Sequence, residues 1–153
     1  MSKKFNLNSL KTNLEKQSKG IWIEYGGGLD VLIGKINSPK YKEYIRKAGA
    51  KYRHQIDRGT VDPEVIEDLV KKAMSKFVLL DWRNMYDEEV DSSGEPVLDE
   101  DGEPKLVEVE YSEQKAYEIL SNKEFDEFYE TISSLASDHK LFLEETIKLD
   151  SGN

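Results

Sequence analysis

Apolar residues recur at helical spacing over residues 62–82, and this pattern constrains the fold more than any other feature of the chain. Asp62 and Pro63 form a helix start, because the carboxylate can cap free amides and the proline needs no partner for an amide proton there. The wide apolar face predicts a central helix of about five turns that must be buried against other elements. Its members are Val65, Ile66, Leu69, Val70, Ala73, Met74, Phe77, Val78, Leu80 and Trp82.

Similar signals predict three further helices. Ser38 and Pro39 repeat the start signal, and a stripe rich in tyrosine runs from there toward Gly59. That stripe comprises Tyr41, Tyr44, Ile45, Ala48 and Tyr52. Another helix begins at residues 111–112, and residues 121–124 have the form of a capping box that opens a last helix of about six turns. The stripe of the last helix comprises Phe125, Phe128, Tyr129, Ile132, Leu135, Ala136, His139, Phe142, Leu143 and Ile147.

Two short segments near the N-terminus read as strands. Residues 21–25 and 29–33 are rich in β-branched and aromatic side chains and flank three glycines at 26–28, which tolerate the positive φ of a tight turn. The sequence therefore predicts a β-hairpin, whose apolar face must lie on the helices or pair with another strand, because an isolated hairpin is marginally stable in water.

An acidic segment spans residues 87–110. Gly94-Glu95-Pro96 recurs as Gly102-Glu103-Pro104, and Lys105 is the only base. Glycine and proline break helices and like charges extend a chain, so this segment is expected to form a linker or a long hairpin. Residues 105–110 alternate between polar and apolar side chains, so a strand is a second alternative for this part of the segment.

These patterns predict a mainly α protein with one compact helical domain over residues 1–153. The domain carries the N-terminal β-hairpin and the acidic insert over residues 87–110, as a loop or a hairpin. Residues 1–19 leave two alternatives open, a short helix over residues 8–19 or a flexible arm. A chain of 153 residues is long enough to bury a self-sufficient core.

Composition narrows the protein class. Charged residues make up 35% and hydrophobic ones 37% of the chain, and the longest apolar run, residues 77–80, is far shorter than the ~20 residues that span a bilayer. The start of the chain leads into polar sequence and shows no apolar signal core. The absence of cysteine fits a reducing compartment. We therefore expect a cytoplasmic protein that makes no membrane contact.

The sequence shows no catalytic pattern. Its two histidines, His54 and His139, lie outside any paired-ligand spacing, and no cysteine is present. The glycines at 26–28 lack the pattern of a phosphate-binding loop. Asp99-Glu100-Asp101-Gly102 does not meet the spacing of a calcium loop. We therefore expect no enzyme, no cofactor and no structural metal.

The net charge argues against nucleic-acid binding by the chain as a whole. Its net charge of −9 repels phosphate backbones. Residues 35–58 form a local exception, with eight lysines and arginines against two acids, interleaved with tyrosines. Tyrosines at helical spacing are more often core residues, so we interpret this segment as a solvated helix face.

The order of these signals resembles that of the tail assembly chaperones of long-tailed bacteriophages and prophages. The resemblance covers about residues 20–145 and depends on the succession of motifs. These are Gly20-Ile21-Trp22-Ile23, then Lys35-Ile36-Asn37-Ser38-Pro39-Lys40-Tyr41, then a helix ending in Phe77-Val78-Leu79-Leu80-Asp81-Trp82-Arg83-Asn84, then after the acidic loop Tyr111-Ser112-Glu113 with Ala116 and Leu120, then a phenylalanine-rich helix from Phe125 to Phe142.

The resemblance implies a protein of the host cytoplasm that binds the tape-measure protein during tail assembly and shields its apolar helices. It also implies help in recruiting the tail-tube protein, absence from the mature virion, and homo-oligomers. Three alternatives stay open. They are a structural head-tail or tail-tube component, an acidic DNA mimic that inhibits a host protein through residues 87–110, and a transcriptional regulator that uses the basic helix.

The last predicted helix has more apolar positions than one small helix pair covers. Part of its stripe is therefore predicted to be a surface for a partner or for self-association, because large exposed apolar patches mark interaction sites. The candidate residues fall in two groups, the first being Phe125, Phe128 and Tyr129 and the second Leu141 and Phe142.

Overall fold

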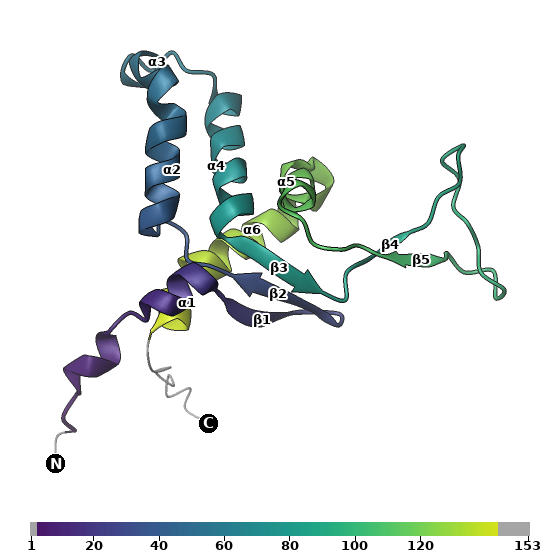
Figure 1. Cartoon of the computed structure of the whole chain (residues 1–153), viewed down its shortest axis with the longest axis horizontal. Helices are drawn as coiled ribbons and strands as arrows, with labels where there is room; N and C mark the ends of the chain where they lie inside the picture. The colour runs from purple at the N-terminus through teal and green to yellow at the C-terminus, as the bar shows by residue number, and fades with distance from the viewer. Residues whose placement is uncertain (1–2, 144–153) are drawn as a thin grey trace.

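A three-stranded antiparallel sheet lies at the centre of the molecule, whose computed structural model describes residues 3–143 (Figure 1). Strands β1 (Ile21–Gly26) and β2 (Leu29–Ile33) form the predicted hairpin, with Ile21 opposite Ile33. Strand β3 (Leu79–Arg83) pairs with the other edge of β2. The prediction of a β-hairpin is thus confirmed. A third strand, β3, pairs with its free edge and extends it to a three-stranded sheet.

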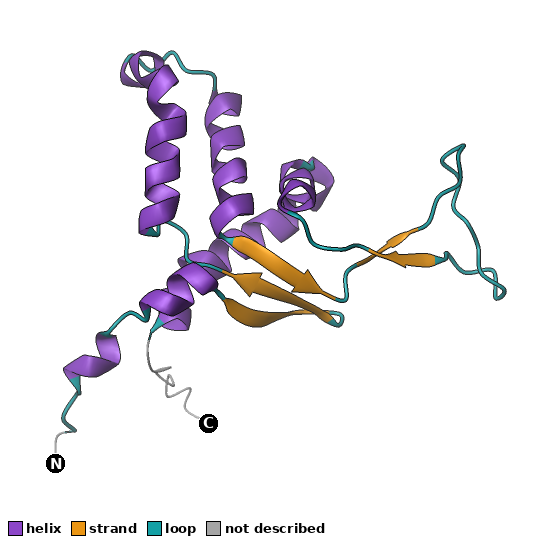
Figure 2. Ribbon diagram, viewed as in Figure 1, coloured by secondary structure: helices purple, strands orange, loops and turns teal. Residues whose placement is uncertain are grey.

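The mainly α prediction is wrong. Helices make up 51% and strands 20% of the described residues, so the protein is mixed α/β, with two small antiparallel sheets (Figure 2). The difference lies at residues 79–82, which the apolar spacing places in the central helix. In the structure α4 (Pro63–Phe77) ends before them and β3 begins at Leu79.

A β-bulge explains why β3 was taken for helix. Successive β2 residues Leu32 and Ile33 face Asp81 and Leu79, so Leu80 is an extra residue in β3. The bulge brings Leu79 and Trp82, three positions apart, to the buried side. Spacing by three is the signature of a helix face, and here a bulged strand produces it.

Helices α2, α4 and α5 begin at the capping residues that the sequence indicates. Ser38 accepts from the amide of Tyr41 at the start of α2 (Pro39–Gly49), and Asp62 caps α4. Ser112 caps α5 (Glu113–Ser121). A 3-10 turn, η2 (Ala50–Tyr52), links α2 to the short α3 (Arg53–Asp57). Helices α2 and α4 project together from the body as an antiparallel pair (Figure 1).

The predicted six-turn last helix is also wrong. Helix α6 (Asp126–Ser137) stops before Asp138, whose backbone is extended and whose carboxylate accepts from the amide of Lys140. A 3-10 turn, η4 (His139–Phe142), follows, and Ile147 lies outside the described residues. At the other end Asn122, and not Ser121, caps the 3-10 turn η3 (Lys123–Phe125) that precedes α6. Asparagine and aspartate side chains thus divide the stripe into separate segments.

The acidic segment forms a projecting hairpin, here called the acidic arm (residues 86–108; Figure 1). Strands β4 (Tyr86–Glu88) and β5 (Leu106–Glu108) pair at its base. Beyond them, three backbone hydrogen bonds of 2.8 Å form a closed ring: Glu89 N donates to Lys105 O, Lys105 N to Val97 O, and Val97 N to Glu89 O. Two tight loops, residues 90–96 and 98–104, extend from this ring.

The core lies between the sheet and helices α4, α5 and α6. Its largest fully buried side chains are Phe142, Ile33, Met74, Leu79, Leu120, Ile132, Val31 and Val78. The N-terminal region contains a 3-10 turn, η1 (Leu7–Leu10), and a helix, α1 (Leu14–Lys19). The latter is attached to the body, because Gln17 O accepts from Lys35 N and Asn13 N donates to Phe142 O. None of the helices within residues 3–143 is long and apolar enough to cross a membrane.

Gly34 joins three of these segments, and we expect Gly34→Ala to destabilise the fold. Its amide donates to Val78 O, and a Cβ placed on it would lie 2.3 Å from Phe77 O and 3.1 Å from Gln17 O. Backbone atoms cannot yield as a flexible side chain can, so the free energy of unfolding should fall by about 1–3 kcal/mol or more.

Gly49→Ala is the matched control. A Cβ at Gly49 meets no atom within 4 Å, and φ is −82° there, so stability should stay the same or rise by up to about 1 kcal/mol. Urea unfolding followed by circular dichroism measures both variants. Equal stability of the two would contradict the close packing at Gly34.

Candidate protein-binding site

Phe125 and Phe128, two of the predicted partner residues, line an apolar cavity of about 380 Å³ at the base of the acidic arm. We call it the apolar groove. Its walls come from the β1–β2 turn region, the base of the arm, α5, and the η3–α6 segment. The lining residues are Tyr25, Leu29, Met85, Tyr86, Asp87, Val109, Lys115, Ile119, Phe125 and Phe128.

Contacts between these segments shape the groove. The rings of Tyr25 and Phe128 pack with centroids 5.1 Å apart, which joins β1 to α6. Val109 N donates to Met85 O over 2.8 Å and closes the base of the arm. Asn84 Nδ2 donates to Gly28 O over 3.1 Å and holds the start of the arm against the hairpin turn. The walls are therefore fixed to one another before any partner arrives.

The residues that line the groove differ in solvent exposure: partly buried side chains form its floor and exposed ones its rim. Met85, Val109, Ile119 and Phe128 are partly buried against the core. Phe125 keeps 45% of its surface exposed and Tyr86 keeps 53%, so two aromatic side chains stand free to gain contacts. Large aromatic residues beside a preformed apolar hollow are typical of protein-binding sites.

The buried Trp82 and the partly buried Tyr111 form an aromatic pair that supports the arm side of the groove. Trp82 Nε1 donates to Val109 O over 2.7 Å, and the rings of Trp82 and Tyr111 meet edge to face with centroids 4.8 Å apart. The hydroxyl of Tyr111 donates to Leu79 O over 2.7 Å. Burial raises the pKa of Tyr111 to about 12, since its ionised form would lose solvation. The wall that Val109 forms is thereby connected to β3.

The other predicted partner residues lie elsewhere. Phe142 is fully buried and offers no surface in this structure, and Leu141 packs partly buried against the core. The ring of Tyr129 contacts Lys71, whose Nζ lies 5.4 Å from its centroid. The candidate surface therefore narrows to Phe125 and Phe128. Sequence reasoning missed the rest of the groove, because its other walls come from segments distant in sequence.

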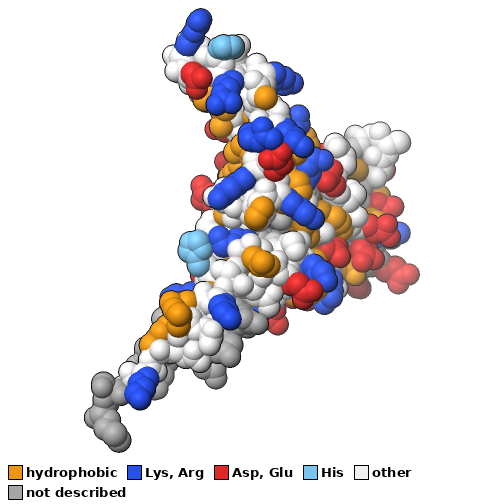
Figure 3. All heavy atoms as spheres, turned by 60° about the vertical axis from the view of Figure 1, so that its left-hand side comes forward, with side chains coloured by type: hydrophobic (Ala, Val, Ile, Leu, Met, Phe, Trp, Pro, Cys, Tyr) orange, Lys and Arg blue, Asp and Glu red, His pale blue; other side chains and the backbone are white. Residues whose placement is uncertain are grey.

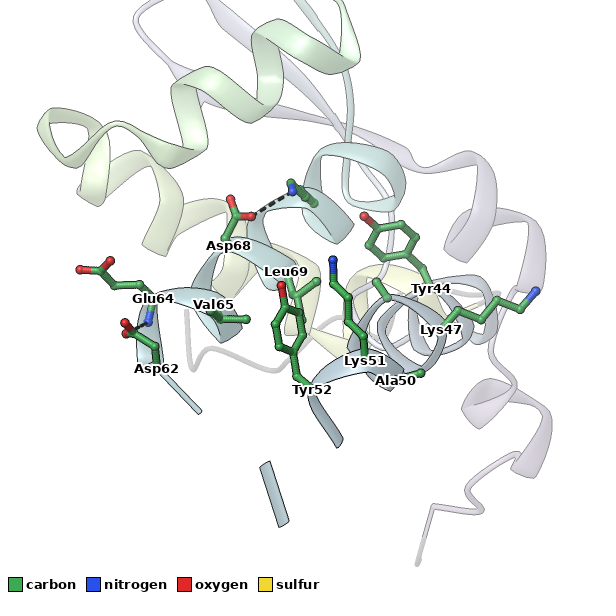
Figure 4. A pocket seen from close by; sticks show the side chains of 12 residues that line it. Tyr44, Lys47, Ala50, Lys51, Tyr52, Asp62, Glu64, Val65, Asp68 and Leu69 are labelled. Atoms are coloured by element: carbon green, nitrogen blue, oxygen red, sulfur yellow. Dashed lines mark hydrogen bonds and ion pairs between the residues drawn. The ribbon is translucent and has the colours of Figure 1, made fainter. Parts of the chain in front are cut away.

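A larger hollow of about 710 Å³ opens between α2 and α4, and half of the twelve residues that line it are charged (Figure 4). Lys47 and Lys51 face it from the α2 side, and Asp62 and Glu64 from α4. Asp68 pairs with Lys72 over 3.0 Å and accepts the hydroxyl of Tyr117, which holds the pKa of Asp68 below its usual range. A charged, open hollow suits an apolar partner less well than the apolar groove does.

Neither of these two hollows is lined by a histidine. His54 and His139 are exposed on α3 and η4, apart from both. Within residues 3–143 no three histidine, aspartate or glutamate side chains gather as a metal site would require.

Tyr111→Phe should change both stability and titration. At neutral pH the loss of the hydroxyl leaves Leu79 O without this donor, which should lower the free energy of unfolding by about 1–3 kcal/mol. In the native protein the stability that Tyr111 contributes should fall as pH rises from about 10, where an unfolded tyrosine ionises, to about 12, where Tyr111 ionises.

Ultraviolet difference spectroscopy of tyrosinate measures this directly. The variant should lack one late-ionising tyrosine, and its stability should decline less steeply in the same pH window. An unchanged titration curve would show that Tyr111 is not buried as described.

Comparison with known proteins supplies the family. A family model described as the YdaY prophage protein matches residues 36–153, which include the basic helix, the acidic arm, α5 and α6. The match omits the β1–β2 hairpin and so leaves out Tyr25 and Leu29 of the groove. No curated protein and no solved structure matches the chain. With three quarters of its length matched, this chain belongs to the YdaY prophage protein family.

Proposed function

We propose that this prophage protein is a tail assembly chaperone that binds an apolar segment of the tape-measure protein in the apolar groove. The observation that carries the proposal is the groove itself, a preformed apolar hollow with an exposed phenylalanine on a chain that is 35% charged. The order of sequence motifs and membership of a prophage family support the choice of partner.

The groove suits an amphipathic helix. Phe125 and Tyr86 are exposed, so both can enclose an inserted side chain, while Met85 and Phe128 form an apolar floor. Asp87 and Lys115 at the lining can orient polar groups beside the inserted face. This is the helix-in-groove mode, in which a few apolar anchors carry most of the affinity.

Binding without catalysis is part of the proposal. The polar side chains that line the groove are two tyrosines, one aspartate and one lysine. They supply no histidine or cysteine and no paired carboxylates, the side chains from which acid–base or nucleophilic catalysis is usually built. The same protein can recruit the tail-tube protein through another surface and be released before the virion is complete.

One observation bears on the alternative that the protein is an acidic DNA mimic. The acidic segment, which the sequence predicts to be a linker or a long hairpin, forms a hairpin with a closed ring of backbone hydrogen bonds, so its carboxylates are carried by an ordered backbone. Competition between duplex DNA and this protein for a host DNA-binding partner distinguishes that function from a chaperone. Presence of the chain in purified virions would instead favour a structural tail component.

Phe125→Asp should weaken binding to the tape-measure protein at least tenfold, because a buried carboxylate replaces an apolar anchor. Phe125 is 45% exposed, so its replacement should leave the fold intact, whereas Phe128 packs on Tyr25 and its replacement would also disturb the core. Co-purification after co-expression, followed by titration calorimetry, measures the effect.

Phe5→Asp is the matched control, since it introduces the same change at a side chain that is 66% exposed and lies outside the groove. This variant should bind as the native protein does. A folded Phe125→Asp protein that still binds the tape-measure protein with native affinity would overturn the assignment of the groove.

A further inference from the structure

Charge is separated between the two projections of the molecule. Residues 87–110 carry eleven acids and one base, a net charge of −10, so the rest of the chain has a net charge of only +1. Residues 35–58, a segment that contains α2, η2 and α3, carry eight bases and two acids. Figure 3 shows lysine and arginine side chains gathered over the upper projection and acidic side chains on the side of the arm.

The acidic arm also exposes apolar side chains. Val90, Leu98 and Leu106 are 56%, 58% and 60% exposed, although most side chains of this type are buried in folded proteins. Val90 and Leu98 occupy equivalent places in the two loops, each followed directly by an aspartate. The arm therefore presents two apolar side chains in an acidic surround.

A groove on the helical pair has the opposite charge. It has a volume of about 360 Å³ and lies between α2–α3 and α4. We call it the hairpin groove, after the helical hairpin that α2, α3 and α4 form. Its apolar lining is Ile45, Ile56, Ile66, Leu69 and Val70, with Arg46, Arg53 and Asp57 as charged members. Ile56 is 43% exposed, and the apolar side chains of α4 are only half-buried as far as Val70, whereas Ala73 and Met74 nearer the sheet are fully buried.

We propose that the acidic arm of one copy docks in the hairpin groove of a second copy. The apolar side chains of the two arm loops would enter the apolar floor while their carboxylates meet Arg53 and Arg46. Arg53 forms no ion pair with any described residue. Arg46 forms an ion pair with Glu43, with 2.7 Å between the guanidinium nitrogen and the carboxylate oxygen. Opposite charge and shared apolar character are the two properties that a specific interface needs.

The contact must be made between molecules. Figure 1 shows the arm and the helical pair leaving the body in different directions, with β3 and α5 between them. An arm that docks on another copy leaves its own hairpin groove free. Such a head-to-tail contact generates rings or open chains rather than a closed dimer.

A second copy fits the hairpin groove better than nucleic acid does. Phosphates would match the arginines, but they would leave Ile56 and Ile66 uncovered and would face Asp57. The arm offers carboxylates and apolar side chains together. Salt should weaken the contact, since much of the attraction is between exposed charges.

Complementary charge reversal tests the proposal. The groove variant carries Arg46→Glu and Arg53→Glu, and the arm variant carries Glu100→Lys, Asp101→Lys and Glu103→Lys. The side chains of these three arm residues accept no hydrogen bond from any described residue, so the loop should keep its shape. Sedimentation velocity before and after nuclease treatment, at low and high salt, measures association.

Native protein should associate at low salt and dissociate at high salt. Each variant alone should associate at least tenfold more weakly, and an equal mixture should recover association, because the unchanged arm of the groove variant can then dock in the unchanged groove of the arm variant. A variant with Lys3→Glu and Lys4→Glu, which changes charge outside both surfaces, should behave as the native protein does. Recovery in the mixture also excludes misfolding as the cause.

Three outcomes would overturn the proposal. These are native protein that stays monomeric at low salt, variants that associate as the native protein does, and a mixture that fails to recover. Association that disappears with nuclease treatment would also overturn it and would assign the hairpin groove to nucleic acid. Because Phe125 lies outside both surfaces, Phe125→Asp should leave self-association unchanged, so failure of either proposal can be recognised separately.

Discussion

The pairing of β3 with β2 is the interaction on which the rest of the structure depends. A single residue, Val78, separates α4 from β3, so pairing of the strand also fixes the direction in which α4 leaves the sheet. The other end of β3 leads into the arm, whose return strand reaches Val109, and Trp82 holds that carbonyl. One short strand therefore orients the helical pair, the acidic arm and one wall of the apolar groove.

The apolar groove shares only Tyr86 and Asp87 with the acidic arm and no lining residue with the hairpin groove. The apolar groove lies where sheet, arm base and α5–α6 meet, whereas the acidic arm and the basic helical pair lie beyond it on separate projections (Figure 1). A partner held in the groove does not occupy the hairpin groove, because the two share no lining residue. A ligand in the apolar groove and a second copy at the hairpin groove would therefore not compete for the same lining residues.

Turns and helix caps could be predicted from the sequence, whereas strand pairing and contacts between distant segments could not. The glycines at 26–28 and the caps at Ser38 and Asp62 act within a few residues, so the hairpin and the helix starts were predicted. The bulge at Leu80 gave a strand the spacing of a helix, and Asp138 ended a stripe that looked continuous. In the site, Phe125 and Phe128 belong to one stripe and were found, but Met85 and Val109 meet them only through tertiary folding.

The acidic arm illustrates how a segment can be ordered without a core. Hydrogen bonds between Glu89, Val97 and Lys105, eight residues apart, close its ring, and Asp91 and Asp99 each accept two backbone amides in their loops. Backbone bonding of this kind contributes little net free energy in water, where isolated hairpins are marginal. With Val90, Leu98 and Leu106 exposed as well, the arm has stabilisation still to gain, and burial of those side chains against another surface would supply it.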